Sequence, residues 1–61
     1  MLFSDLISVL NADDTIHVVQ CDDSLYFGTV RNAFDLSDTI QNKKVSYVTT
    51  AFCGILIEVT D

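Results

Sequence analysis

Residues 55–60 form the stretch that most constrains what this chain can fold into. Every second side chain there is hydrophobic and the positions between are mostly polar: Ile55, Ile57 and Val59 alternate with Leu56, Glu58 and Thr60. Successive side chains of a β-strand point to opposite faces, so the pattern predicts a strand with one buried and one wet face. Such a strand needs a second layer against its buried face, which predicts a two-layer domain.

Three further stretches have the composition of strands. β-branched and aromatic residues gather in 15–21, 25–30 and 45–50, and a short polar segment separates the first two. We expect two antiparallel hairpins, because connections this short favour a hairpin over a crossover. Gly28 interrupts the second stretch and predicts a bulge or a close backbone approach.

Hydrophobic residues recur at helical spacing in residues 1–10, namely at Phe3, Leu6, Ile7 and Leu10. We expect Ser4 to cap the start of this helix and Asn11 to end it. Asp35 predicts the N-cap of a second, short helix over 36–41. The chain is therefore expected to be one domain, residues 1–61, of α+β class. The expected order is α-β-β-α-β-β, with an antiparallel sheet and the helices on one face.

The charge balance narrows the kinds of partner. Nine acidic residues stand against three cations, Arg31, Lys43 and Lys44, which gives a net charge of −6. Binding of nucleic acid draws on Lys and Arg contacts to phosphate, and anionic membranes attract the same residues, so both partners are disfavoured. The acidity favours a protein with a basic surface. Solubility alone explains an acidic excess equally well.

Six aspartates lie where the predicted elements begin and end. They flank the first strand and bracket the second helix: Asp13, Asp14, Asp22, Asp23, Asp35 and Asp38. Carboxylates spaced on a rigid frame can imitate the phosphates of a duplex, so these residues are a candidate acidic surface for a nucleic-acid-binding protein. The simpler explanation is turn chemistry, since aspartate stabilises turns through its own backbone.

No residue pattern indicates catalysis, a metal site or a cofactor. His17 alternates with the inward Ile16 and is expected on the surface of the sheet, without a partner for acid–base work. Cys21 and Cys53 lie beside no group that would lower the pKa of a thiol, and they form no close metal-binding pair. We therefore expect a protein that is not an enzyme and binds neither metal nor cofactor.

Residues 51–54 are unusual for a hairpin tip, because Phe52 and Cys53 stand beside Gly54 where polar residues are usual. They are candidates for a partner or dimer contact, or else Phe52 belongs to the core. The other candidates for this apolar surface are Tyr26, Tyr47 and Leu56. A homodimer would also strengthen a chain of 61 residues, because domains of this size bury only about 60% of their unfolded surface.

Nothing in the sequence indicates export or membrane insertion. Two cysteines are too few for a disulfide framework, no signal-peptide pattern follows Met1, and no apolar run is long enough to span a membrane. We expect a cytoplasmic protein with reduced thiols.

Several segments together resemble a known group of proteins. These are the helical Leu6-Ile7-x-x-Leu10, then Asp13-Asp14-Thr15-Ile16-x-Val18, Leu25-Tyr26-x-Gly28-x-Val30, Asp35-Leu36, Lys44-Val45 and Ile55-x-Ile57-Glu58-Val59. They resemble short, acidic, mostly uncharacterised proteins encoded by phages and prophages of Gram-positive bacteria. The resemblance spans almost the whole chain, but its motifs build the fold and carry no chemistry. It leads one to expect a polar tip in the last hairpin, and Phe52-Cys53 depart from that.

The resemblance implies a bacterial host cell during phage infection. Small phage proteins of this kind often block host enzymes or anti-phage defence systems by stoichiometric binding. We therefore expect a non-enzymatic inhibitor of a host protein with a basic surface. The alternative is a small homo-oligomeric structural or assembly protein of a phage, with no inhibitory role.

Overall fold

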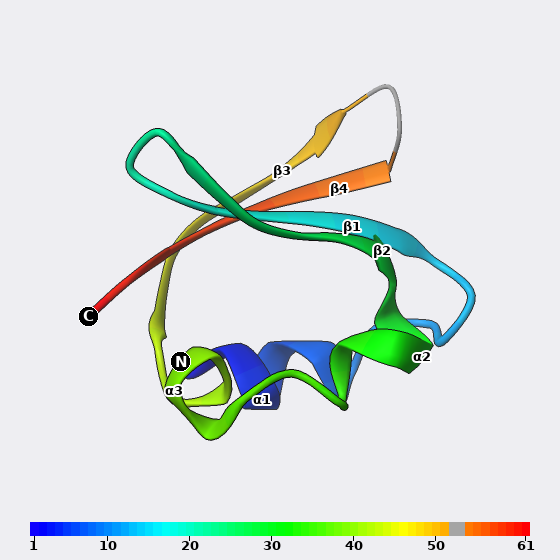
Figure 1. The fold of residues 1–61 in the computed structure, drawn as a ribbon. Coiled ribbons are helices and arrows are strands. Elements are labelled where there is room, and N and C mark those ends of the chain that lie inside the picture. Colours follow the sequence, from blue (N-terminus) through cyan, green and yellow to red (C-terminus); the bar gives the residue numbers. More distant parts are fainter. Residues whose placement is uncertain (52–53) are drawn as a thin grey trace.

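A computed structural model describes residues 1–51 and 54–61 of the chain (Figure 1). Its elements follow one another as α1 (Phe3–Ile7), β1 (Thr15–Gln20), β2 (Asp23–Thr29), α2 (Val30–Ala33), α3 (Asp38–Gln41), β3 (Lys44–Ala51) and β4 (Gly54–Thr60). The α+β class and all four predicted strands are confirmed. The expected second helix over 36–41 is the shorter α3. The helix α2 was not expected: Thr29 Oγ1 accepts a hydrogen bond from the Asn32 amide and starts it directly after β2, at Val30, where the strand was expected to end.

The four strands form one sheet in the order β2-β1-β4-β3. Both hairpins are antiparallel as predicted, but the central strands β1 and β4 run parallel, so the expectation of a purely antiparallel sheet is wrong. The reason is the long connection through α2 and α3. It passes beneath the sheet and brings the second hairpin to the other side of β1, as a parallel neighbour requires (Figure 1).

The helices gather on one side of the sheet, as predicted (Figure 1). Their boundaries differ from the expected ones. The first helix is capped at Leu2, not Ser4, and the Leu2 amide donates to Asp5 Oδ2 at 3.4 Å. It ends at Ile7 and not at Asn11. The third helix is preceded by Ser37 in place of Asp35, and it ends at Gln41, as the expected range does.

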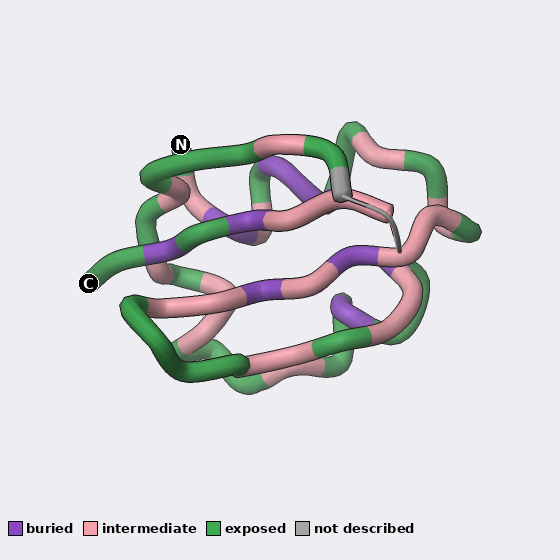
Figure 2. Tube along the Cα trace, turned by 90° about the horizontal axis from the view of Figure 1, so that it is seen from above, coloured by how far each residue is buried: buried purple, intermediate pink, exposed green. Residues whose placement is uncertain are grey.

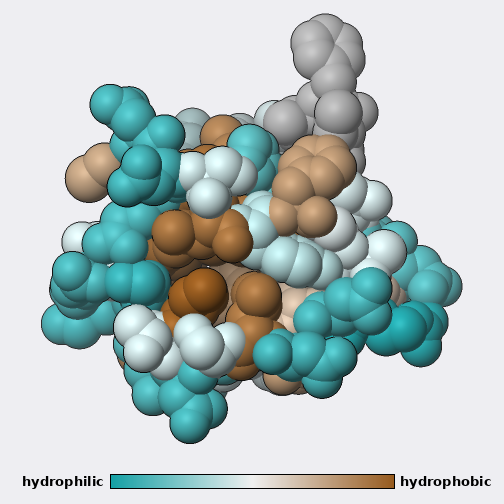
Figure 3. All heavy atoms as spheres, in the orientation of Figure 1, coloured by the Kyte–Doolittle hydropathy of each residue, from teal (hydrophilic) through white to brown (hydrophobic). Residues whose placement is uncertain are grey.

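The core lies between the two central strands and the helices. Its buried residues are Phe3, Leu6, Ile7, Ile16, Val18, Val30, Ala33, Ile57 and Val59. Within the sheet, Figure 2 shows the buried positions confined to β1 and β4. Leu36 and Ile40 are half-buried against this cluster. Figure 3 shows hydrophobic residues reaching the surface between the sheet and the helices, framed by hydrophilic ones. The buried layer is therefore thin.

Gly28 does not mark a bulge. The register shifts where Val18 pairs with Tyr26 but Val19 pairs with Ser24, which leaves Leu25 as the extra residue of β2. At Gly28 the close approach comes from a side chain instead. A Cβ there would lie 2.6 Å from the hydroxyl oxygen of Tyr26. That hydroxyl donates a hydrogen bond to the carbonyl oxygen of Thr29 at 2.7 Å.

The β1–β2 turn contains a strained residue. Gln20 pairs with Asp23, and Cys21 between them has a left-handed backbone with φ of 54°. This region costs an L-residue about 1–2 kcal/mol, whereas glycine enters it freely. We expect Cys21→Gly to raise the free energy of unfolding by about 0.5–1 kcal/mol in urea denaturation. Cys21→Ser is the control, because it keeps the strained backbone. An equal gain in both variants would contradict this explanation.

Candidate interaction surface

We call the face of the sheet opposite the helices the outer face (Figure 1). Strand alternation places on it the residues that flank the buried Ile16, Val18 and Ile57. The pairing register arranges eight of them in two rows across the strands, Phe27-His17-Leu56-Thr49 and Ser24-Val19-Glu58-Tyr47. In the part of the chain that the structure describes, no helix covers this face.

Two aromatic side chains stand at opposite corners of the outer face. Phe27 on β2 and Tyr47 on β3 are each 57% exposed. Three strand spacings, about 14 Å, and two residues along the strands, about 7 Å, separate them. The half-buried Val19 and Leu56 lie between. An aromatic ring with more than half of its surface in water can contribute strongly to an interface that buries it.

His17 packs against Phe27 at one of these corners, as its predicted position on the surface of the sheet allows. Its ring meets that of Phe27 edge to face, with 5.4 Å between the centroids and 73° between the planes. Its Nε2 lies 2.8 Å from Ser24 Oγ in a hydrogen bond. The two contacts restrict the imidazole and the phenyl ring before any partner arrives, which lowers the entropy lost on binding.

Glu58 brings a negative charge to the middle of the second row. It is exposed, and its Oε1 accepts a hydrogen bond from Ser46 Oγ at 3.2 Å. The ion pairs among the described residues join Arg31 to Asp13 and Lys43 to Asp61, so none of them neutralises Glu58. A basic group on a partner would find this carboxylate available.

The predicted apolar contact residues divide between the two faces. Tyr47 and Leu56 lie on the outer face, as a joint contact surface requires. Tyr26 belongs to the helix-facing side, where it packs against the core and is held by its bond to Thr29. Phe52 and Cys53 lie outside the described residues.

Phe27 and Val19 were not predicted as contact residues. Val19 could have been, because it lies two residues after His17 in the same strand and therefore on the same face. Phe27 could not, because a two-residue turn without a bulge pairs Tyr26 with His17 and Phe27 with the inward Ile16. The extra residue Leu25 reverses the inward and outward positions along the rest of β2 and brings Phe27 opposite His17.

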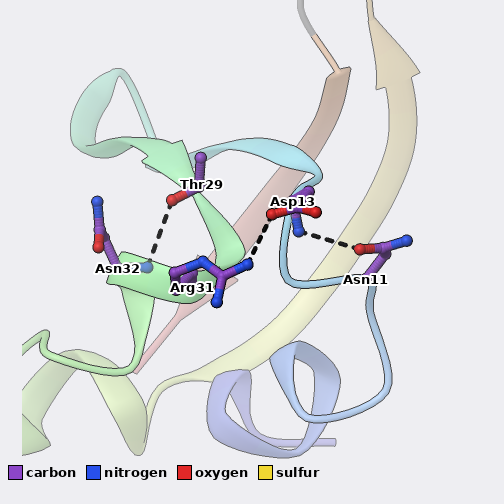
Figure 4. Close-up of polar contacts among 5 residues, drawn as sticks. All are labelled: Asn11, Asp13, Thr29, Arg31 and Asn32. Carbon is purple, nitrogen blue, oxygen red and sulfur yellow. Dashed lines mark hydrogen bonds and ion pairs between the residues drawn. The ribbon is translucent and has the colours of Figure 1, made fainter.

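The six predicted acidic residues do not form one surface. Asp13 and Asp14 precede β1, while Asp22 and Asp23 follow it, and a six-residue strand spans about 20 Å. At the first end, Asp13 is paired with Arg31 at 2.7 Å (Figure 4). Figure 4 also shows Asn11, whose side-chain oxygen accepts from the Asp13 amide at 3.0 Å. Asp13 therefore stabilises the turn before β1, in agreement with the simpler explanation of turn chemistry.

Asp35 and Asp38 lie in the helical layer, away from both pairs. At the far end of the sheet, a hydrogen bond from Lys43 holds the pKa of Asp61 below its usual value, and one from Gln20 acts in the same direction. The acids thus surround the molecule, while Glu58 is the acid on the outer face itself.

The chemistry available on the outer face is limited. The pair of His17 and Ser24 has the distance of a base and a nucleophile, but among the described residues no carboxylate orients the imidazole. Within residues 1–51 and 54–61, no three His, Cys, Asp or Glu side chains lie close enough to hold a metal ion. Over the same ranges no helix is long and apolar enough to cross a membrane.

A comparison with known proteins found no match to this chain among family models, curated proteins or solved structures.

Proposed function

We propose that this chain is a non-enzymatic binding module that docks another protein onto its outer face. The observation that carries the proposal is the pair of exposed rings, Phe27 and Tyr47, on a sheet face that no helix of the described residues covers. The apolar Val19 and Leu56 lie between them, beside His17 and Glu58. Interfaces are enriched in aromatic residues.

The charge of the face supports a partner with basic residues around an apolar contact. Glu58 offers a carboxylate without an ion pair among the described residues, and the net charge of −6 attracts cationic surfaces at long range. Nucleic acid is disfavoured as a partner of this face. The outer face carries no Lys or Arg in its two rows, so it offers phosphates nothing to bind.

The setting comes from the resemblance to phage proteins and rests on it alone. In that setting, the partner is a protein of the bacterial host cytoplasm, such as an anti-phage defence component, and binding blocks it stoichiometrically. Mimicry of a nucleic acid is the less favoured route, because the predicted aspartates are dispersed around the molecule. An assembly protein that binds only copies of itself is the alternative.

Replacing Phe27 tests the proposal. We expect Phe27→Ala to lower the amount of a specific host protein captured from lysate at least about tenfold, as the loss of an aromatic anchor does. Phe34→Ala is the matched control, since Phe34 is 53% exposed but lies at the end of α2 in the helical layer. The captured protein is identified and its dissociation constant measured with the purified components.

Three results would count against this function. Equal losses in both variants would show that Phe27 has no special role. A partner bound through the aspartates alone would leave Phe27→Ala unaffected and lose affinity in Asp→Asn variants. Capture of the chain itself and of no other protein would favour the assembly alternative.

A further inference from the structure

The two edges of the sheet are protected to very different degrees. Edge strands expose backbone groups that can pair with another strand, and proteins block them with charges, bulges and short lengths. β2 has these devices: Asp23 begins it, Leu25 forms a bulge, and Gly28 lies under the ring of Tyr26. The Tyr26 hydroxyl also donates a hydrogen bond to the carbonyl oxygen of Thr29, which is then already paired within the chain.

The other edge strand, β3, is covered only along its first part. The Phe3 amide donates to the carbonyl oxygen of Lys43 at 2.8 Å, and the Val45 amide donates to that of Met1 at 2.9 Å. Leu2 between them forms an antiparallel bridge with Lys44. Ser46 then bulges from the ladder. Beyond it, no described segment pairs with the outer edge of residues 47–50, which we call the open edge.

The composition of the open edge favours strand pairing. Its four residues are Tyr47, Val48, Thr49 and Thr50, all of them common in strands, and it contains no charge, glycine or proline. Tyr47 lies on the outer face, and Val48, opposite Ile57, points to the helix side. Val48 is nevertheless 44% exposed. Hydrophobic surface is therefore uncovered on both sides of this edge.

We propose that the open edge pairs with the same edge of a second copy of this chain, antiparallel and about a two-fold axis at Val48. An antiparallel pair puts residues of the same face opposite each other. The two Val48 side chains would then meet on the helix side. Tyr47 of each copy would lie beside Thr49 of the other on the outer face, an aromatic and β-branched pair of the kind that stabilises sheets.

Closure and charge favour a second copy as the occupant. Pairing of β3 with β2 of another copy would propagate into a fibre, and the devices on β2 oppose it, whereas β3 with β3 closes as a dimer. The nearest acid on the outer face is Glu58, one strand away from the edge. The two Glu58 residues would be at least about 14 Å apart, beyond the Debye length of about 8 Å at physiological salt.

The dimer would extend each four-stranded sheet into its copy and place both outer faces on the same side. This inference goes beyond the docking function. The two surfaces share Tyr47, but the open edge pairs through the backbone groups of residues 47–50, whereas docking uses the side chains of the outer face. One short edge buries little area, so we expect a dimer that dissociates on dilution.

Sedimentation equilibrium between about 10 µM and about 1 mM protein tests the inference, since self-association depends on concentration. The wild-type chain is expected to pass from monomer to dimer. Val48→Lys should raise the dissociation constant at least about tenfold, because it places two like charges directly opposite each other. Val9→Lys is the matched control, since Val9 is 74% exposed beyond the end of α1 and should dimerise as the wild type does.

Amide hydrogen exchange of the wild-type chain provides a readout that needs no variant. Protection within residues 47–50 should rise with protein concentration, while that of β2 stays constant. A monomer at every concentration would overturn the proposal. So would a dimer that Val48→Lys leaves intact, or one whose concentration-dependent protection lies outside β3. Host-protein capture that persists in Val48→Lys would show that the docking function survives without the dimer.

Discussion

Gly54→Ala is expected to lower the free energy of unfolding by about 3 kcal/mol or more, the largest effect of a single methyl group in this chain. Gly54 begins β4 with φ of +131°, which side-chain-bearing residues rarely adopt. A Cβ there would lie 2.1 Å from the carbonyl oxygen of Thr15. That oxygen is backbone at the start of β1, so relief requires the central parallel strands to move apart.

Gly28→Ala is the matched control, because it adds the same methyl group at the other glycine. There the new Cβ would meet the side chain of Tyr26, which can rotate away. The loss is then the hydrogen bond to Thr29, about 1 kcal/mol. Urea denaturation of both variants measures the difference. If Gly54→Ala unfolds no more easily than Gly28→Ala, the close approach of β4 to Thr15 is wrong.

Phe3→Ala is expected to cost about 3–5 kcal/mol, as the loss of a buried phenyl ring usually does. Phe3 is fully buried and is the first residue of α1. A domain of 61 residues has a total stability of about 3–9 kcal/mol. The variant should therefore be partly or wholly unfolded at room temperature, with loss of near-ultraviolet circular dichroism and of dispersed amide signals.

Phe34→Ala removes the same ring from an exposed position and should change the stability by less than about 0.5 kcal/mol. The comparison of Phe3→Ala with Phe34→Ala tests whether the thin core depends on the ring of Phe3. A folded Phe3→Ala variant, with a midpoint close to that of Phe34→Ala, would show that α1 is not required to cover the sheet.

Periodicity predicted the parts of the fold that depend on local side-chain direction. The alternation at Ile57 and Val59 identified the buried face of β4, and the spacing of Phe3, Leu6 and Ile7 identified the buried side of α1. These patterns are direct consequences of burial, so they can be recognised without knowing which elements are neighbours.

Periodicity could not predict the direction in which β1 and β4 pair. A period of two is the same for parallel and antiparallel strands, and the answer depends on the route of the chain through α2 and α3. The prediction of the candidate surface failed in part for a similar reason. Tyr47 and Leu56 were selected as exposed, but Phe27 was missed because the bulge at Leu25 changes which side of β2 faces out.

Mapping the contact on the complex with the captured host protein tests the docking function most directly. We expect the nuclear magnetic resonance signals of the outer face, those of the Phe27 and Tyr47 rings and the Val19 and Leu56 methyl groups, to shift or broaden on titration. The Val9 methyl groups, on the far side of the chain, should not change. Changes confined to the helices or to the aspartate-rich turns, with the Phe27 and Tyr47 rings unaffected, would contradict docking through the outer face.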